Sequence, residues 1–118
     1  MSTVLTQLLN DWKKAFDGHH TDDMAALFTQ DALFQGFGPD VLKGREAVKG
    51  YYEAVPDNRS TEFRILHEYE AAPGAVAGFA DVTFSDPAGW AARVHLSVVA
   101  VADAGTWQIR QYHVSIVQ

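Results

Sequence analysis

The chain has 118 residues, of which 47% are hydrophobic, so it is long enough and apolar enough to fold around one core. Its formal net charge of -6 argues against binding of nucleic acids, whose phosphates need a basic surface, and no apolar stretch reaches the roughly 20 residues of a membrane-spanning helix. The chain has no cysteine, which excludes disulfides, and its first residues lack the pattern of a secretion signal, so we expect a cytoplasmic protein.

Helical periodicity dominates the first half of the chain. Thr3 suits the N-cap of a first helix, whose apolar stripe recurs every three or four residues at Leu5, Leu8, Leu9, Trp12 and Phe16. A second, short helix is expected to start at Thr21, and a third to run over residues 45–55 and end at Pro56. Between these two helices, residues 31–39 predict a short extended segment broken by glycines.

Beyond Pro56 the apolar residues alternate with a period of two, which indicates strands. Turn-forming residues divide this half of the chain into four strands, over residues 62–71, 76–84, 90–102 and 106–118. Three helices followed by a four-strand meander predict one α+β domain over residues 1–118.

The first of these hairpins gives His67 a predicted face. If Pro73-Gly74 forms a two-residue loop, Ala72 lies opposite Ala75, and His67 and its same-face neighbours meet apolar partners on the next strand. We therefore expect His67 to face the helices and Asp81 to lie on the opposite side of the sheet.

The register of the last hairpin has alternative solutions. A three-residue loop over residues 103–105 would place Ala102 opposite Thr106 and bring His95 across from His113 on the inner face. A two- or four-residue loop would instead turn inward Val94, Leu96 and Val98. We favour the three-residue loop, because Asp-Ala-Gly suits a type I turn followed by a glycine bulge.

The last strand is apolar at both odd and even positions. Trp107 and Ile109 share one parity, and Tyr112 and Val114 share the other. Because alternate residues of a strand point to opposite faces, we expect each face of this strand to be covered.

Several features together resemble a known family. They are Trp12 and Phe16 on the first helix, the Leu27-Phe28-x-x-Asp31-Ala32 junction, the segment Lys43-Gly44-Arg45-Glu46-Ala47-Val48, and the ending Trp107-x-Ile109…His113-x-Ser115. In this order, and over nearly the whole chain, they are similar to the SnoaL-like branch of the NTF2-like superfamily. The resemblance implies a cone-shaped barrel with three N-terminal helices packed on a curved antiparallel sheet. It also implies a pocket at the wide end and a homodimer through the outer sheet face.

The resemblance is less specific for activity, because this superfamily includes both enzymes and non-catalytic modules. Residues 31–37 and the Gly44-Arg-Glu sequence resemble ketosteroid isomerases. Gly36, however, stands where those enzymes place their catalytic Asp, and Trp12 stands where they place a Tyr, which counts against isomerisation by their mechanism. The polyketide cyclases of the SnoaL branch use a carboxylate and a histidine farther along the sheet, but Asp81 is expected on the wrong face.

His113 is the predicted catalytic residue, since imidazole is the side chain best suited to proton transfer near neutral pH. The alternative is a buried histidine that a backbone carbonyl or Ser115 satisfies. We expect the pocket to be lined by Trp12, Phe16, Phe34, Tyr52, His67, His95, His113 and Ser115, although aromatic residues at these spacings also fit a plain core. No His-x-His pair or paired carboxylate suggests a metal, and no cofactor is expected.

Two functional hypotheses follow from these residues and this resemblance. The first is a protein that binds a small apolar molecule, polyketide-like or steroid-like, in the cone, with His113 as general acid or base in isomerase or cyclase chemistry. The second is a non-catalytic dimeric binding or assembly module, in which Tyr112 and Val114 contact the second subunit.

Overall fold

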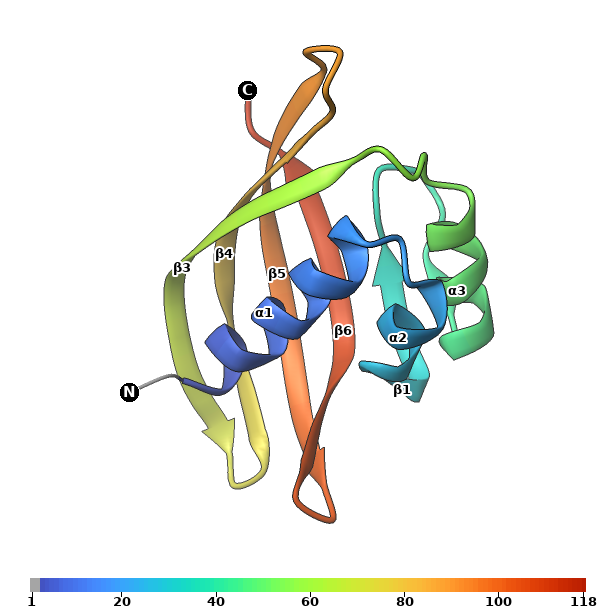
Figure 1. Cartoon of the computed structure of the whole chain (residues 1–118). Coiled ribbons are helices and arrows are strands. Elements are labelled where there is room, and N and C mark those ends of the chain that lie inside the picture. The colour runs from blue at the N-terminus through green and yellow to red at the C-terminus, as the bar shows by residue number, and fades with distance from the viewer. Residues whose placement is uncertain (1–2) are drawn as a thin grey trace.

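The computed structural model describes residues 3–118 and contains three helices and six strands (Figure 1). In chain order the elements are α1 (Val4–Asp17), α2 (Thr21–Ala26), β1 (Phe28–Gln35), β2 (Leu42–Lys43), α3 (Arg45–Glu53), β3 (Ser60–Ala72), β4 (Ala75–Ser85), β5 (Ala91–Asp103) and β6 (Thr106–Ile116). The predicted α+β class, with helices first and a four-strand meander last, is confirmed. Within residues 3–118, no helix is both long and apolar enough to cross a membrane.

All six strands form one sheet in the order β2-β1-β6-β5-β4-β3. Figure 1 shows α1 crossing one face of this curved sheet, with α2 and α3 beside β1. Neighbouring strands run antiparallel except β1 and β6, which are parallel. Parallel strands need a long connection, and here the chain passes through α3 and β3–β5 between them. The expected antiparallel sheet is therefore a mixed one with a single parallel pair.

The core lies between α1 and the inner face of the sheet. Thr3 caps α1 as predicted, because its side chain accepts a hydrogen bond from the backbone N–H of Thr6. The predicted stripe of α1 is buried, and Trp12 is fully inaccessible. The side chains of the sheet that belong to the same core as this stripe include Val82, Val94, Leu96, Val98, Ala100 and Ile109.

A bulge explains why β6 is apolar at both parities. Ile109 pairs with Ala100 and Gln111 pairs with Val99, so Arg110 is an extra residue in β6. Before the bulge Ile109 points inward, and after it Tyr112 and Val114 do. The expectation that the two parities mark two covered faces, with Tyr112 and Val114 against another subunit, is therefore wrong.

The turn between β5 and β6 also differs from the favoured expectation. Asp103 pairs with Thr106, so the loop has two residues, Ala104 and Gly105, with φ of 51° and 83°. Two successive positive φ values are the signature of a type I′ turn, whose twist matches that of the strands. The three-residue loop is wrong, and the alternative register with Val94, Leu96 and Val98 inside is the one observed.

Two further bulges shift the register of β3 against β4. The two-residue loop with Ala72 opposite Ala75 is confirmed, but the register then shifts between Glu70 and Ala72 and again between Ile65 and His67. His67 consequently pairs with Phe79 on the outer face, and its predicted inward position is wrong. Asp81 lies on the outer face as predicted, directly across from Arg64.

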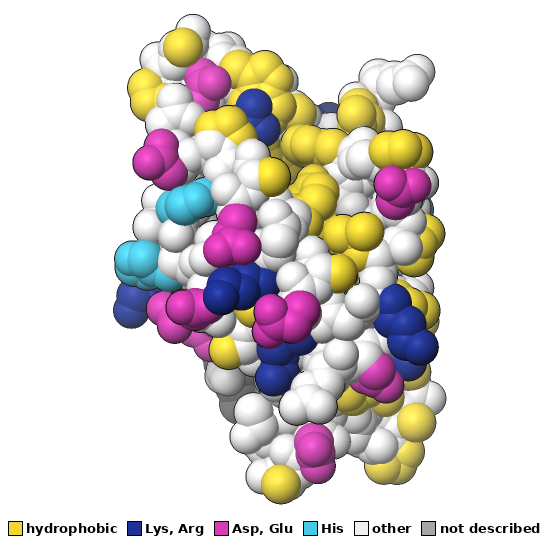
Figure 2. All heavy atoms as spheres, turned by 90° about the vertical axis from the view of Figure 1, so that its right-hand side faces the viewer, with side chains coloured by type: hydrophobic (Ala, Val, Ile, Leu, Met, Phe, Trp, Pro, Cys, Tyr) yellow, Lys and Arg dark blue, Asp and Glu magenta, His cyan; other side chains and the backbone are white. Residues whose placement is uncertain are grey.

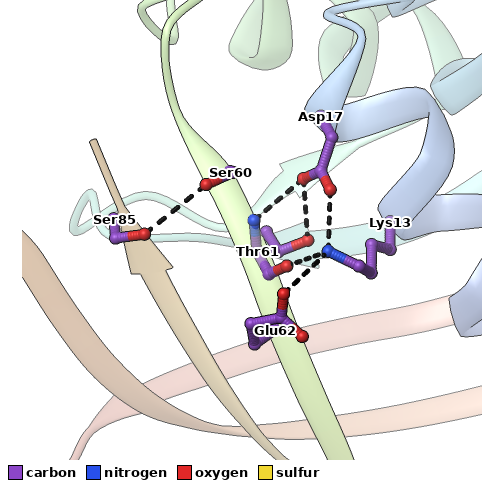
Figure 3. Close-up of polar contacts among 6 residues, drawn as sticks. All are labelled: Lys13, Asp17, Ser60, Thr61, Glu62 and Ser85. Atoms are coloured by element: carbon purple, nitrogen blue, oxygen red, sulfur yellow. Dashed lines mark hydrogen bonds and ion pairs between the residues drawn. The ribbon is translucent and has the colours of Figure 1, made fainter. Parts of the chain in front are cut away.

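Polar contacts tie the C-terminal end of α1 to the start of β3 (Figure 3). One carboxylate oxygen of Asp17 accepts hydrogen bonds from the Thr61 backbone N–H at 2.8 Å and from the Thr61 hydroxyl at 3.1 Å. The Lys13 ammonium lies 2.7 Å from the other oxygen of Asp17 and also donates to the Thr61 carbonyl. Because Thr61 is buried, this cluster satisfies backbone and hydroxyl groups that would otherwise lack partners.

Candidate functional site

An aromatic pocket opens where the ends of α3 and β1 meet the sheet. Its volume is about 200 Å³. Figure 2 shows hydrophobic side chains gathered near the top of the face that carries it. The lining residues come from α1, α3, β4, β6 and the loops after β1 and α3, and are Phe16, Gly36, Phe37, Gly38, Tyr51, Tyr52, Ala54, Val55, Pro56, Arg59, Phe84, Tyr112 and Val114.

Two buried tyrosines form the floor of the pocket. The Trp12 indole N–H donates to the Tyr52 hydroxyl oxygen at 3.0 Å. Burial raises the pKa of both Tyr52 and Tyr112 well above the usual range for tyrosine. The ring of Tyr112 stacks on Phe34, with the centroids 4.5 Å apart. Both hydroxyls therefore keep their protons and act as neutral hydrogen-bond groups.

Tyr51 forms one wall of the pocket and is held by the chain that leaves β1. Its hydroxyl oxygen accepts a hydrogen bond from the Phe37 backbone N–H at 2.9 Å. At Gly36 the backbone approaches this ring so closely that a Cβ atom would lie 2.2 Å from the Tyr51 oxygen. A glycine at position 36 is thus required by the close approach of β1 and α3.

Arg59 supplies the charge at the pocket. It lies just before β3, and its guanidinium carbon is 3.9 Å from the centroid of the Trp90 ring. Its Nε atom is buried and has no hydrogen-bond partner in the described part of the chain. The titratable side chains that line the pocket are thus three tyrosines and one arginine.

Comparison with protein-family models gives a match to the SnoaL-like domain over residues 5–118. The chain belongs to this family. Comparison with curated protein sequences found no match. The predicted membership of the NTF2-like superfamily is therefore confirmed.

Solved structures of similar fold have varied descriptions. A ketosteroid isomerase-like protein from Erwinia carotovora atroseptica is 18% identical, with a TM-score of 0.82 over 98% of this chain and 95% of that chain. A putative scytalone dehydratase from Novosphingobium aromaticivorans is 14% identical, with a TM-score of 0.81 over 97% and 82%. A putative calcium/calmodulin dependent protein kinase II association domain from Xanthomonas campestris is 19% identical, with a TM-score of 0.79 over 96% and 85%. At such identities the likeness shows a shared fold.

The SnoaL-like domain brings only some of the predicted site residues together. Phe16 and Tyr52 line the pocket. Trp12 and Phe34 lie behind it in the core, where they contact Tyr52 and Tyr112. These four aromatic residues are thus parts of the pocket or of its immediate support.

The remaining four predicted lining residues lie on the outer face of the sheet. His67 pairs with Phe79, His95 with Ser115, and His113 with Ser97, and all three histidines and Ser115 are exposed. Their expected position on the inner face is wrong, because the bulges and the two-residue turn reverse the parity. His113 lines a separate, open hollow beside Leu33, Gln35 and Gln111. A catalytic role for His113 is not tested by its position and stays a prediction.

The outer face also carries an ion-pair cluster around Asp81. Its carboxylate lies 2.8 Å from a guanidinium nitrogen of Arg93 and 3.4 Å from one of Arg64. The hydrogen bond from Arg93 holds the pKa of Asp81 below its usual range.

Within residues 3–118 no cluster of three or more histidine, aspartate or glutamate side chains is placed to hold a metal ion.

Sequence reasoning missed Arg59, Phe84 and Tyr112 as pocket residues. Arg59 stands in the polar segment 56–60, which resembles an ordinary surface loop, and nothing local indicates that its side chain turns inward. Tyr112 was placed on the wrong face by the unrecognised bulge at Arg110. The doubled apolar parity of β6 was the signal that could have revealed that bulge.

Proposed function

We propose that this SnoaL-like domain binds a small, flat and largely apolar molecule in the aromatic pocket. The observation that carries the proposal is the combination of an apolar wall with a few convergent polar groups, which is typical of small-molecule sites. Aromatic rings such as Phe16, Phe84 and Tyr112 offer faces and edges to a planar ligand.

The size of the pocket limits the ligand. Its volume of about 200 Å³ is below the roughly 300–1,000 Å³ of pockets that hold drug-sized molecules. A compound of one or two rings fits this space better than a four-ring steroid. Of the two ligand classes expected from the sequence, a small aromatic, polyketide-like carbonyl compound is therefore favoured.

The hydroxyl of Tyr52 is the group best placed to orient such a carbonyl compound. Its oxygen already accepts a hydrogen bond from the Trp12 indole N–H, so its own O–H is left to donate. A hydroxyl that keeps its proton can polarise a carbonyl but cannot act as a base. Among the described pocket-lining residues no imidazole or carboxylate supplies that base, so binding is proposed in preference to acid–base catalysis.

The test is a thermal-shift and amide chemical-shift screen of one- and two-ring aromatic ketones, such as acetophenone and 1-tetralone. Binding in the pocket should raise Tm and move the amide signals of Gly36 and Gly38, which line it, and leave that of Gly105 at the distant hairpin in place. The variant Ala54→Trp should block the opening, whereas Ala71→Trp, exposed on β3, should bind as the unaltered chain does. If no ketone moves the Gly36 and Gly38 signals, the pocket does not bind neutral aromatic ketones, and if the corresponding aromatic acids and amides leave these signals in place as well, the proposal fails.

A homodimer through the outer face of the sheet is the second candidate, and exposed aromatic residues on that face support it. Tyr69 is 61% exposed and Phe79 is 49% exposed, which is unusual for large apolar side chains on a free sheet surface. Sedimentation equilibrium should then show a dimer that Phe79→Glu dissociates. Val41→Glu, at another exposed apolar residue outside the sheet, is the matched control. A monomer at all concentrations would remove this candidate.

A further inference from the structure

Arg59 is a charged side chain at an otherwise uncharged pocket. It is the only residue with a formal charge among the described residues that line the cavity. Its guanidinium lies over the ring of Trp90, in the loop before β5. Stacking of this kind fixes the plane of the guanidinium while leaving its N–H groups free at the edge of that plane.

The guanidinium of Arg59 has unused capacity to donate hydrogen bonds. Its Nε is buried without a partner, and none of the ion pairs among residues 3–118 includes Arg59. The other arginines near carboxylates differ in this respect, since Arg64 and Arg93 share Asp81 and Arg110 pairs with Asp31. A buried donor of a charged group that lacks an acceptor destabilises the protein, and an incoming acceptor would relieve that cost.

We propose that Arg59 makes the pocket selective for ligands that carry a carboxylate or another planar anionic oxygen group. This inference rests on the proposed function, because it names the chemical class that the same pocket accepts. The planar fork of a guanidinium binds a carboxylate through two parallel N–H···O bonds, and such charge-assisted bonds are about twice as strong as neutral ones. The ligand is thus an aromatic acid, with its rings among Phe16, Phe84 and Tyr112 and its carboxylate at Arg59.

The experiment compares matched acids and amides on the same chain. The probes are benzoate with benzamide, 2-naphthoate with 2-naphthamide, and 4-biphenylcarboxylate with its amide. Each is titrated by calorimetry, and the Gly36 and Gly38 amide signals locate the binding. For the ring system that fits, the acid should bind roughly ten- to a hundredfold more tightly than the amide, as expected for hydrogen bonds to charged groups.

The variant Arg59→Met keeps the length of the side chain and removes its charge. It should abolish the preference for the acid, so that acid and amide bind with about equal affinity, and circular dichroism shows whether the variant is folded. Arg64→Met, which removes an arginine of the outer face, should keep the full preference. If Arg59→Met does not fold, the comparison of acids with amides on the unaltered chain still tests the proposal.

The outcomes separate the two proposals. If an amide binds at Gly36 and Gly38 as tightly as its acid, the pocket binds small molecules but the selectivity proposed for Arg59 is wrong. If Arg59→Met retains the preference for the acid, that role is again wrong. If none of the six probes nor the aromatic ketones binds at these positions, the proposed function falls together with this inference.

Discussion

At Gly36 the backbone of the loop after β1 lies close to the Tyr51 side chain. Its neighbour along the chain, Phe37, donates its N–H to Tyr51, and the Tyr51 ring crosses the space that a Cβ atom at position 36 would occupy. The contact joins the loop after β1 to α3, so it sets the position of one pocket wall.

We expect Gly36→Ala to destabilise the protein and to weaken ligand binding. The new Cβ atom would lie 2.2 Å from the Tyr51 oxygen, so the ring must move, and overpacking of this kind costs about 1–3 kcal/mol. Gly38→Ala is the matched control, because a Cβ atom there meets nothing within 4 Å. Urea denaturation measures both variants. Equal stability of the two would show that Tyr51 does not hold the wall as described.

Asp17 is the last residue of α1, and its carboxylate accepts hydrogen bonds from the start of β3. A carboxylate at a helix C-terminus is electrostatically unfavourable, and its position is explained by the hydrogen bonds that it accepts from Thr61 (Figure 3). The interaction links the last turn of α1 to the first residues of β3.

Asp17→Ala should lower the free energy of unfolding by about 1–3 kcal/mol, because it leaves the N–H and hydroxyl of buried Thr61 without an acceptor. Glu62→Ala provides the comparison, since its side chain is 86% exposed and lies 3.4 Å from the same lysine, Lys13. That variant should change stability by less than about 0.5 kcal/mol. Chemical denaturation measures the free energy of unfolding of both variants. A loss in Glu62→Ala as large as that in Asp17→Ala would contradict the role assigned to Asp17.

At the scale of the element, β6 is defined by its bulge. A single extra residue, Arg110, lets the strand bury Ile109 at one end and Tyr112 and Val114 at the other, with opposite parity. The same device in β3 turns His67 outward. Each bulge thus decides which side chains can reach the pocket.

A pair of adjacent substitutions tests this register. Val114→Asp should unfold the protein or cost several kcal/mol, because it buries an unpaired charge at a side chain that is 7% exposed. Ser115→Asp, one residue along on the outer face, should change stability by less than about 0.5 kcal/mol. Circular dichroism with thermal melting distinguishes the two. The reverse result would indicate a strand without the bulge, with His113 and Ser115 inside.

At the scale of the whole molecule, the outer face of the sheet is held by charge as well as by backbone hydrogen bonds. Asp81 lies between two arginines of neighbouring strands, and the hydrogen bond from Arg93, followed by the charges of Arg93 and Arg64, lowers its pKa against the opposing effect of desolvation. The folded state therefore binds fewer protons at this carboxyl than the unfolded state does at mildly acidic pH.

This lowered pKa predicts a contribution to acid unfolding. The stability due to Asp81 is present above the usual carboxyl pKa of about 4, and it is lost as the pH falls through the lowered value in the folded state. Asp81→Asn should therefore be less stable than the unaltered chain near neutral pH and lose less stability on acidification. Denaturation curves collected between neutral and strongly acidic pH provide the measurement. Asp103→Asn at the exposed hairpin serves as the control, and parallel curves for Asp81→Asn and the unaltered chain would contradict the prediction.

Much of the architecture could be predicted because it depends on local pattern. Short segments of the sequence indicate their own secondary structure. Examples are the apolar spacing of α1, the turn at Pro73-Gly74 and the alternation beyond Pro56. The family resemblance placed these elements in the right fold. The cytoplasmic location, the lack of a cofactor, the lack of nucleic-acid binding and the single-domain organisation stay predictions.

The pocket could be predicted only in part, and the residues show why. Phe16 and Tyr52 belong to helices, whose periodicity fixes their inward face within a few residues. His67, His95, His113 and Ser115 belong to strands, where one extra residue or a different turn length reverses every later side chain. The histidines were therefore assigned to the pocket and lie outside it.

The sequence by itself determined the α+β class and the helix that builds the core, because these follow from periodicity over many residues, and its resemblance to known sequences indicated the family. Only the tertiary structure decided which face of each strand is buried, because the bulges at Leu66 and Arg110 reverse the facing of the residues beyond them. That choice replaced a histidine pocket by one of tyrosines and Arg59, and with it catalysis by a histidine by the binding of a small molecule as the proposed function.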